Sequence, residues 1–553
     1  MIFNPKQFNN NLGKEYHVAV IGAGPQGVLY ASWLKQTRPD LRVIILEREV
    51  TPKYKIGEST LSGFCKALRS VGISQQVLES LFFPKNGLGF FHIDESVQNV
   101  VAASEYILET FDETFQVERR ILDGLLIANA RRLGVEVIQG ARVELSSSHL
   151  SDLDNLITYR YNQENYELKC KLVVDASGPA SIIAKHFDLY TKEDVLFQNN
   201  AVWGYFKNVN RLGNRQNWFN LSQFDRDEYT QHFCFREGWM WYIPIVSWEE
   251  LENDNLNSMF DHLLNSEQVV PTKKDLSARY GCPEEDIVSI GLVLRQDRDD
   301  QFRQGRQVAF NHYLEKYPAI KQMLEGAELI SDLYETQQPL KARANIRGYA
   351  KQIVGDGWLS IGEAAFFVDP LISPGLTSGV ATAYFAAQTT LNAFNNNNFS
   401  RQALIEYEHF AYKLYEALER DNQLVYMSFN HPKAIKLIQR FQEIDARRHF
   451  NQHNSSDYTL ADTNVWGILN PVYQSLQKQL WQIMRQAELK VGKEKNIEVQ
   501  SLEDYEFMVE QITNYLSNYL NNHLELNPYI TQNQPNHQLE TEFAYLNSLS
   551  CLS

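Results

Sequence analysis

A glycine-rich turn near the start of the chain constrains the fold more than any other feature of the sequence. The apolar run at 17–21 leads into Gly22, Gly24 and Gly27, and apolar residues at helical spacing follow. A second β-branched run ends in Glu47, twenty positions beyond the third glycine. Glycines in this arrangement allow a tight turn and the close approach of a pyrophosphate to a helix N-terminus, and the carboxylate would accept ribose hydroxyls. The opening therefore predicts a βαβ unit that binds a dinucleotide.

A second cluster favours one dinucleotide. Gly362, Glu363 and Asp369 follow a short apolar run at 358–361, and a helix of small residues is predicted to begin at Gly375. A second helix N-terminus that faces the centre of the fold suits the C2 carbonyl and N1 region of a flavin, so FAD fits better than NAD. Asp175 ends another buried run, in a D-A-S-G turn expected beside the adenine end of the cofactor.

Shifts in composition predict the domain organisation. The FAD-binding domain is expected in two parts, at 15–190 and 291–400, and the aromatic segment 191–290 is expected to form a substrate-side antiparallel sheet. Residues 401–553 are expected to be helical, with a loosely ordered tail from about 525. The predicted fold class is therefore α/β: a doubly wound, Rossmann-like FAD-binding domain, an inserted antiparallel-sheet substrate domain and a helical C-terminal region.

Composition argues against several other classes of protein. The 553 residues carry a formal net charge of −16, which disfavours nucleic acid as a partner. No apolar run approaches the roughly 20 residues of a membrane span, and the first residues lack the order of a signal peptide, so a cytoplasmic protein is expected. The five cysteines are scattered without a C-x-x-C pair, so neither a disulfide framework nor a metal site is predicted.

Two further motifs are much more specific than the glycine turn. The pattern W-x-W-x-I-P is present as Trp239, Trp241, Ile243 and Pro244, and F-x-x-P-x-x-S-x-G spans 367–375. On these motifs the sequence resembles the flavin-dependent halogenases, within the hydroxybenzoate-hydroxylase-like FAD-binding superfamily. The resemblance implies an FADH2-dependent enzyme that uses O2 and chloride or bromide to halogenate an electron-rich aromatic, a phenol, indole or pyrrole, in natural-product biosynthesis.

The resemblance also implies roles for individual residues. In such enzymes a hypohalous acid forms beside the flavin and travels through a tunnel to a catalytic lysine, which Lys85 matches. The W-x-W-x-I-P residues would separate the flavin from the substrate cavity. Ser373, Gly375 and Leu376 would hold the halide, although Pro374 supplies no N–H group for it.

Two positions depart from the family pattern. Glu363 stands where an aspartate is usual, so its contact with the ribityl chain would need to accommodate an extra methylene. Ile372 stands where an acidic residue assists the lysine in many tryptophan-specific members, so free tryptophan is not the first choice of substrate.

Other interpretations of the same residues remain open from the sequence. Without the motifs, Lys85 is more typical of a solvated surface lysine, and the two tryptophans are more typical of a half-buried aromatic strand. Arg119 either reaches the FAD phosphates or lies exposed at the start of a helix.

The predicted function has its own alternatives. The fold also fits a geranylgeranyl-reductase-like enzyme, an aromatic monooxygenase, or a flavin-binding module without turnover. No second nucleotide fingerprint for NAD(P)H is apparent, so a separate flavin reductase is the expected partner, with an aromatic small molecule or carrier-tethered substrate.

Overall fold

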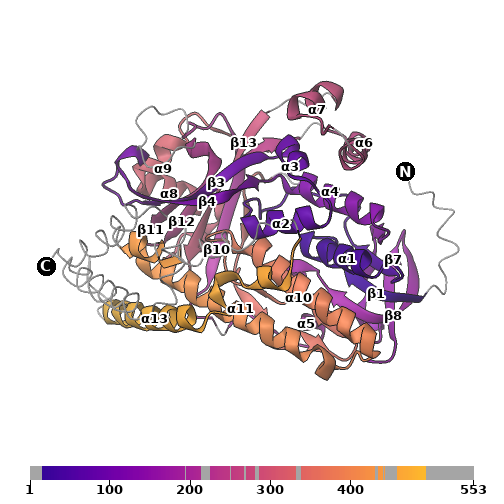
Figure 1. The fold of residues 1–553 in the computed structure, drawn as a ribbon. Coiled ribbons are helices and arrows are strands. Elements are labelled where there is room, and N and C mark those ends of the chain that lie inside the picture. The colour runs from indigo at the N-terminus through magenta and orange to yellow at the C-terminus, as the bar shows by residue number, and fades with distance from the viewer. Residues whose placement is uncertain are drawn as a thin grey trace, which may run out of the picture.

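The computed structural model contains two large sheets with helices packed around them (Figure 1). It describes residues 15–193, 195–212, 225–248, 251–266, 269–280, 285–331, 338–429, 434–439, 441–442 and 457–492. No helix in these ranges is both long and apolar enough to cross a membrane. The predicted loosely ordered tail from 525 onward lies outside the described residues.

The first sheet has the doubly wound topology that the glycine turn predicts. Its strand order is β17-β18-β8-β1-β2-β5, and the neighbours from β18 to β5 are parallel. The strands are β1 (Glu15–Ile21), β2 (Val43–Glu47), β5 (Glu136–Gln139), β8 (Glu164–Asp175), β17 (Val354–Gly355) and β18 (Trp358–Ser360), with β6 (Arg142–Val143) and β7 (Asn155–Tyr161) beside them. Strand β1 is central, and its second half, Val18 to Ile21, is buried on both faces, which explains the apolar run there.

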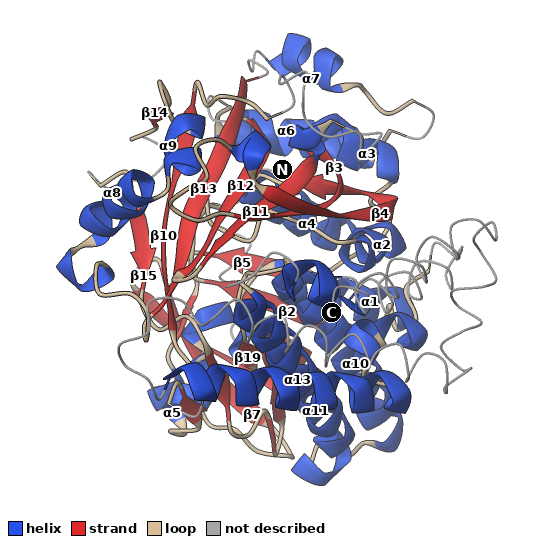
Figure 2. Cartoon of the chain, turned by 90° about the vertical axis from the view of Figure 1, so that its left-hand side faces the viewer, coloured by secondary structure: helices blue, strands red, loops and turns tan. Residues whose placement is uncertain are grey.

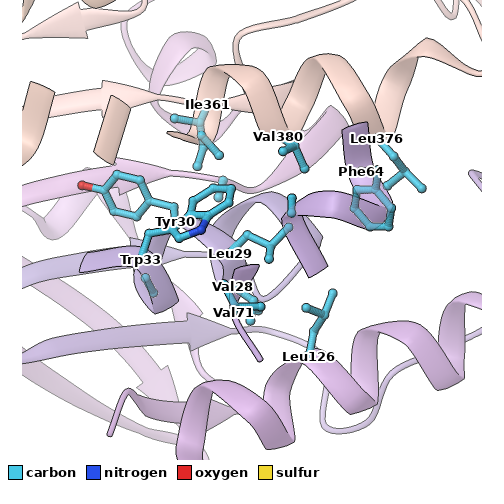
Figure 3. Packing of buried hydrophobic residues seen from close by; sticks show 14 of the residues in the cluster. Val28, Leu29, Tyr30, Trp33, Phe64, Val71, Leu126, Ile361, Leu376 and Val380 are labelled. Carbon is cyan, nitrogen blue, oxygen red and sulfur yellow. The ribbon is translucent and has the colours of Figure 1, made fainter. Parts of the chain in front are cut away.

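Helices α1 (Pro25–Thr37), α4 (Arg119–Arg132) and α10 (Pro374–Asn396) pack on one face of this sheet. Figure 3 shows Val28 and Leu29 of α1 close to Val380 of α10 and Leu126 of α4. The other face carries α5 (Ile182–His186) and the β7 region. The apolar contacts of α1 fix the direction of its N-terminus, which is the end that follows the glycine turn.

The second sheet has the order β14-β10-β13-β12-β11-β3-β4, and β15 pairs with β10. Its strands are β3 (Phe83–His92), β4 (Ser104–Gln116), β10 (Asn199–Lys207), β11 (Tyr229–Phe235), β12 (Gly238–Ser247), β13 (Glu285–Arg295), β14 (Glu328–Leu329) and β15 (Lys341–Arg343). It is antiparallel except where β3 pairs with β11 in parallel. Strands β3 and β4 come from the range 15–190, so this sheet includes more than the predicted insertion; the exact domain boundaries stay a prediction.

Strand β12 is buried on both faces and carries different side chains on each. Trp239 and Trp241 point toward the core shared with the C-terminal helices, whereas Met240 and Tyr242 point toward α8 (Arg306–Lys316) and α9 (Pro318–Met323). Figure 2 shows α8 and α9 along the outer side of this sheet. The alternation follows the two-residue period of a strand.

Two C-terminal helices, α11 (Arg401–Ser428) and α13 (Pro471–Gly492), lie side by side along the lower edge of the molecule in Figure 1. Near its start, α11 contacts the first sheet, where Tyr407 Oη donates to the Ser360 carbonyl at 2.6 Å. Near its end it contacts the second sheet, where the indole N–H of Trp239 donates to Tyr426 Oη. Helix α11 therefore connects the two sheets.

The remaining elements are short and complete the packing. They are α2 (Ser62–Ser70), α3 (Gln75–Leu81), α6 (Asn253–Leu264), α7 (Lys273–Tyr280), β9 (Tyr190–Thr191), β16 (Gly348–Ala350) and β19 (Phe366–Phe367).

Candidate active site

The glycine turn between β1 and α1 leaves open space at one of its three glycines. Gly22 has a φ of +106°, and a Cβ atom there would lie 2.5 Å from the Ala176 carbonyl oxygen. A Cβ at Gly27 would lie 2.4 Å from the Gly22 carbonyl oxygen, so both positions must be glycine for the backbone to pack. At Gly24 the nearest atom to a Cβ is the side-chain oxygen of Gln26, at 3.9 Å. The space at Gly24 is therefore free for a ligand.

Glu47 lies beside this turn. Its Oε2 accepts from the Ala23 amide at 2.7 Å and its Oε1 from the Glu49 amide at 2.9 Å, which fixes the carboxylate at the edge of the predicted dinucleotide site. Asp175 is placed differently: its two oxygens accept from the amides of Ser177 and Ile183, and burial raises its pKa. Asp175 therefore shapes its own turn, and its contact with a cofactor stays a prediction.

The start of α10 presents backbone amides without a capping side chain. Ile372 and Ser373 have φ values of +63° and +55°, and no side chain of the described residues caps the helix after them. The amides of Gly375 and Leu376 follow Pro374 in the first turn, where the positive end of the helix dipole favours an anion or a flavin carbonyl. A pocket opens at this helix start, with Gly362, Glu363, Phe367, Gly375, Ser378 and Gly379 among its lining residues.

Arg119 is buried at the start of α4, so the interpretation as an exposed helix-start arginine is wrong. Its guanidinium donates to Asp123 at 3.0 Å and to the Ile56 carbonyl at 3.1 Å. It also lies close enough to Glu363 for the two charges to attract each other. Arg119 therefore interacts with a residue that lines the pocket at the start of α10, and its contact with FAD phosphates stays a prediction.

Lys85 is completely buried, which excludes the solvated surface lysine as an interpretation. It lies on β3 immediately before an irregularity in the pairing of β3 with β4. Its Nζ donates to the Thr60 carbonyl at 2.5 Å, and the loss of water around the ammonium lowers the pKa of Lys85 to about 7. No carboxylate of the described residues is among the groups that shift this pKa, and a value near 7 makes the protonated and neutral forms both accessible near neutral pH.

Ser59 joins the start of α10 to the region of Lys85. The Ser373 hydroxyl donates to Ser59 Oγ at 2.8 Å, and Ser59 shares a hydrogen bond of 2.7 Å with Thr230 on β11. The next residue is Thr60, which accepts from Lys85. The predicted halide residue Ser373 and the predicted catalytic lysine are thus connected through two consecutive residues of the G-E-S-T segment.

Trp239 and Trp241 form a buried layer on β12, here called the tryptophan wall. Their ring centroids are 5.9 Å apart, and Trp241 Nε1 donates to Ser289 Oγ at 3.1 Å. Ile243 and Pro244 continue the strand and are also buried. The aromatic strand is therefore fully buried, and the half-buried alternative is wrong.

Two buried titratable residues near the wall escaped the sequence analysis. Glu58 accepts from Tyr205 Oη at 2.5 Å, and burial raises the pKa of Glu58 to about 7. His232 stacks on Phe90 at 4.6 Å, and burial lowers the pKa of His232 to about 3, so its ring is neutral. The G-E-S segment could have pointed to Glu58 as a site residue. No sequence pattern pointed to His232, because its position depends on the pairing of β11 with β3.

Asp369 borders the pocket, but its carboxylate faces a buried polar network. It accepts from Asn199 Nδ2 at 2.5 Å, from the Leu371 amide at 3.0 Å and from Tyr426 Oη at 3.2 Å. These bonds give Asp369 a structural role, and its contact with a cofactor stays a prediction.

Comparisons with known proteins find an FAD-binding domain and relatives among the flavin-dependent halogenases. A family model described as an FAD binding domain matches residues 15–204. The flavin-dependent halogenase malA of Malbranchea aurantiaca is 29% identical over 512 residues, which cover 85% of this chain and 74% of that protein. A 1H-pyrrole-2-carbonyl-[peptidyl-carrier protein] chlorinase of Pseudomonas fluorescens is 25% identical, over 71% of this chain and 80% of that protein.

Solved structures show the same fold. Halogenase PltM superposes with a TM-score of 0.72 at 19% identity and covers 93% of this chain and 97% of its own. The flavin-dependent brominase Bmp2 gives a TM-score of 0.62 at 18% identity, over 87% of this chain and 100% of its own. The predicted resemblance to the flavin-dependent halogenases and the predicted fold class are confirmed.

Proposed function

We propose that this relative of the flavin-dependent halogenases is itself an FADH2-dependent halogenase that uses O2 and chloride or bromide to halogenate an electron-rich aromatic. The observation that carries the proposal is the position of Lys85. It is a buried amine with a pKa near neutrality, and it donates to the Thr60 carbonyl. The residue before Thr60 is Ser59, which accepts from Ser373 at the start of α10. A structural lysine gains nothing from such burial without a counter-ion, because the lost hydration destabilises its charge.

The residues around the glycine turn fit FAD. Gly24 leaves room for the pyrophosphate at the N-terminus of α1, Glu47 lies where the ribose is expected, and the amides of Gly375 and Leu376 are free for the flavin edge or a halide. Bound reduced FAD, with O2 and halide, supplies the hypohalous acid. The protein residues then have to contain that oxidant and deliver it.

Lys85 is suited to receive the hypohalous acid. As an ammonium, Lys85 donates a hydrogen bond to the oxygen of HOX. As a neutral amine, the Lys85 nitrogen attacks the halogen, so that an N–X bond forms and water leaves. The halogen then passes to a ring carbon of the substrate, which gives up a proton. Burial favours the neutral amine, and the Thr60 carbonyl orients it.

The yield of halogenated product per FADH2 consumed should rise with pH through about 7. Burial holds the pKa of Lys85 near that value, well below that of an exposed lysine, so the reactive neutral form increases as the pH rises. Product is measured by chromatography and FADH2 oxidation by flavin absorbance between pH 6 and 8. A yield that is flat or falls over this interval contradicts a neutral-amine role.

Replacement of Trp241 by alanine should leave FAD binding intact and raise the hydrogen peroxide released per FADH2 oxidised. Trp241 is buried against Trp239, and in the proposed role its indole separates the cofactor from the substrate cavity. Its removal would then open a path for the oxidant to escape. Trp248→Ala is the matched control, because Trp248 is equally buried but packs in the core of the first sheet. Equal peroxide release from the two variants would show that Trp241 only supports packing. Trp241→Phe removes less of the side chain and should raise peroxide release less than Trp241→Ala does.

The proposed substrate is an electron-rich aromatic, and the proposed partner is a flavin reductase. A phenol, indole or pyrrole, free or tethered to a carrier protein, fits the relatives that act on pyrrole-2-carbonyl carrier proteins. A separate flavin reductase supplies FADH2, and the cytoplasm is the proposed location. The test is to incubate a panel of such aromatics with enzyme, reductase, O2 and halide and to measure the masses of the products by mass spectrometry. A product that gains oxygen or hydrogen identifies a monooxygenase or reductase instead, and bound FAD without any product identifies a flavin-binding module.

A further inference from the structure

The end of α11 contributes one side chain to the boundary between the two sheets. Tyr426 is fully buried, and its hydroxyl accepts from Trp239 Nε1 at 2.8 Å while it donates to Asp369 at 3.2 Å. Asn199 Nδ2 lies 3.0 Å from the same hydroxyl and 2.5 Å from Asp369. The tryptophan wall and the segment before α10 are thus joined through a residue of the C-terminal helical region.

Asp369 needs these donors because it is buried. Its carboxylate has no exposed surface, and the nearest cation, Arg347 Nε, is 3.9 Å away. Arg347 lies over the rings of Phe197, at 4.3 Å, and Tyr426, at 5.9 Å, so the tyrosine also contacts the counter-ion. An unpaired carboxylate at this depth is strongly unfavourable, and loss of any donor therefore has consequences for the position of the carboxylate.

Asp369 is also the first residue of the turn that leads to α10, here called the helix-start turn (369–373). Its Oδ1 accepts from the Leu371 amide at 3.0 Å, and the two following residues have left-handed φ values. Left-handed backbone at Ile372 and Ser373 is strained and persists only where neighbouring contacts hold it. The bonds to Asp369 are contacts of this kind, and they lie directly before the proposed halide residues.

We propose that Tyr426 is a positioning residue that holds both the indole of Trp239 and the helix-start turn in place. Through it the C-terminal helix α11 helps to seal the route of the oxidant. This inference rests on the proposed function, because sealing matters only where an oxidant passes. Without the hydroxyl, the indole N–H and one Asp369 oxygen lose their common partner. The indole is then free to turn or admit water, and hypohalous acid or peroxide escapes before it reaches Lys85.

Tyr426→Phe removes the hydroxyl and keeps the ring. We expect folded protein with unchanged FAD affinity, and peroxide release per FADH2 oxidised that rises about fivefold, the factor that corresponds to one ordinary net hydrogen bond. Tyr407→Phe is the matched control: it removes another buried hydroxyl bond from the same helix, at the contact with Ser360 in the first sheet. Tyr407→Phe should leave peroxide release unchanged.

A double-mutant cycle tests whether Tyr426 acts through Trp239. Trp239→Phe lacks the indole N–H, so adding Tyr426→Phe to it should raise peroxide release much less than in the wild-type background. A general loosening of the core would instead give additive effects. Additivity, or a rise in the Tyr407→Phe control equal to that in Tyr426→Phe, overturns the inference.

An NMR readout separates this inference from the proposed function. In protein labelled with ¹⁵N-tryptophan, the indole signal missing from Trp239→Phe identifies Trp239, and that signal should shift upfield in Tyr426→Phe but not in Tyr407→Phe. An unshifted signal overturns the contact whatever the enzyme makes. A wild-type enzyme without halogenated product refutes the proposed function, and the shift still reports on the contact.

Discussion

Lys85→Met is expected to lower the rate of halogenation by on the order of 10²-fold or more, the usual cost of removing a positioned catalytic group. Oxidation of FADH2 should continue at the wild-type rate, because the proposed flavin chemistry depends on the residues around the glycine turn and not on the amine of Lys85. Methionine fills the buried space without a charge, so the variant tests chemistry rather than packing. Product formation and flavin absorbance are followed in the same reaction.

Lys85→Arg is the companion variant and should fail as well. Guanidinium stays protonated, supplies no neutral amine and presents its donors in a planar fork. Near-wild-type halogenation by folded Lys85→Met would mean that the lysine has no catalytic role. Rescue by arginine would instead identify a role for positive charge alone.

Gly24→Val is expected to abolish FAD binding at concentrations that saturate the wild type. The structure leaves the space beside Gly24 empty, so the new side chain does not collide with the protein but occupies the proposed pyrophosphate site. Charge-assisted hydrogen bonds contribute about 1.5–3 kcal/mol each, so losing two of them lowers affinity by on the order of 10²–10⁴.

FAD titration followed by fluorescence measures this loss, with thermal unfolding of the FAD-free proteins as the check on folding. Gly24→Ala provides a graded comparison, because its single methyl group should weaken binding less than valine does. A folded Gly24→Val protein with unchanged FAD affinity would place the cofactor elsewhere.

The local elements of the first sheet were predictable from the sequence because short-range signals encode them. The apolar run of β1, the glycine turn and the helical spacing of α1 lie within one stretch of chain, and the structure has all three as expected. The helix of small residues predicted from Gly375 begins one residue earlier, at Pro374, since proline suits the first turn of a helix.

The arrangement of the second sheet was much harder to predict. The parallel pairing of β3 with β11 brings together segments that are far apart in the chain, and no local pattern announces it. Lys85 is buried where β3 pairs with β4 and where the Thr60 carbonyl accepts from it, contacts that the sequence does not reveal, so the sequence alone left a surface lysine open. The motif resemblance, rather than any physical pattern, singled out this residue.

Several polar contacts depend on tertiary packing that periodicity does not report. Arg119 was expected either at the phosphates or in solvent; its burial rules out the solvent alternative, and its pairing with Asp123 was not predicted. Tyr426 occurs in a helical segment with nothing to distinguish it from a core tyrosine, yet it meets both Trp239 and Asp369. Such contacts follow from the path of α11 between the two sheets.

The most direct test of the account is the mass of the product formed from an electron-rich aromatic by the wild-type enzyme with a flavin reductase, O2 and bromide. The account predicts a product in which bromine replaces a ring hydrogen, recognisable by two isotope peaks of nearly equal height, formed only when bromide, O2 and reduced flavin are all present. A product that carries added oxygen or hydrogen in place of bromine, formed equally well without halide, would contradict it.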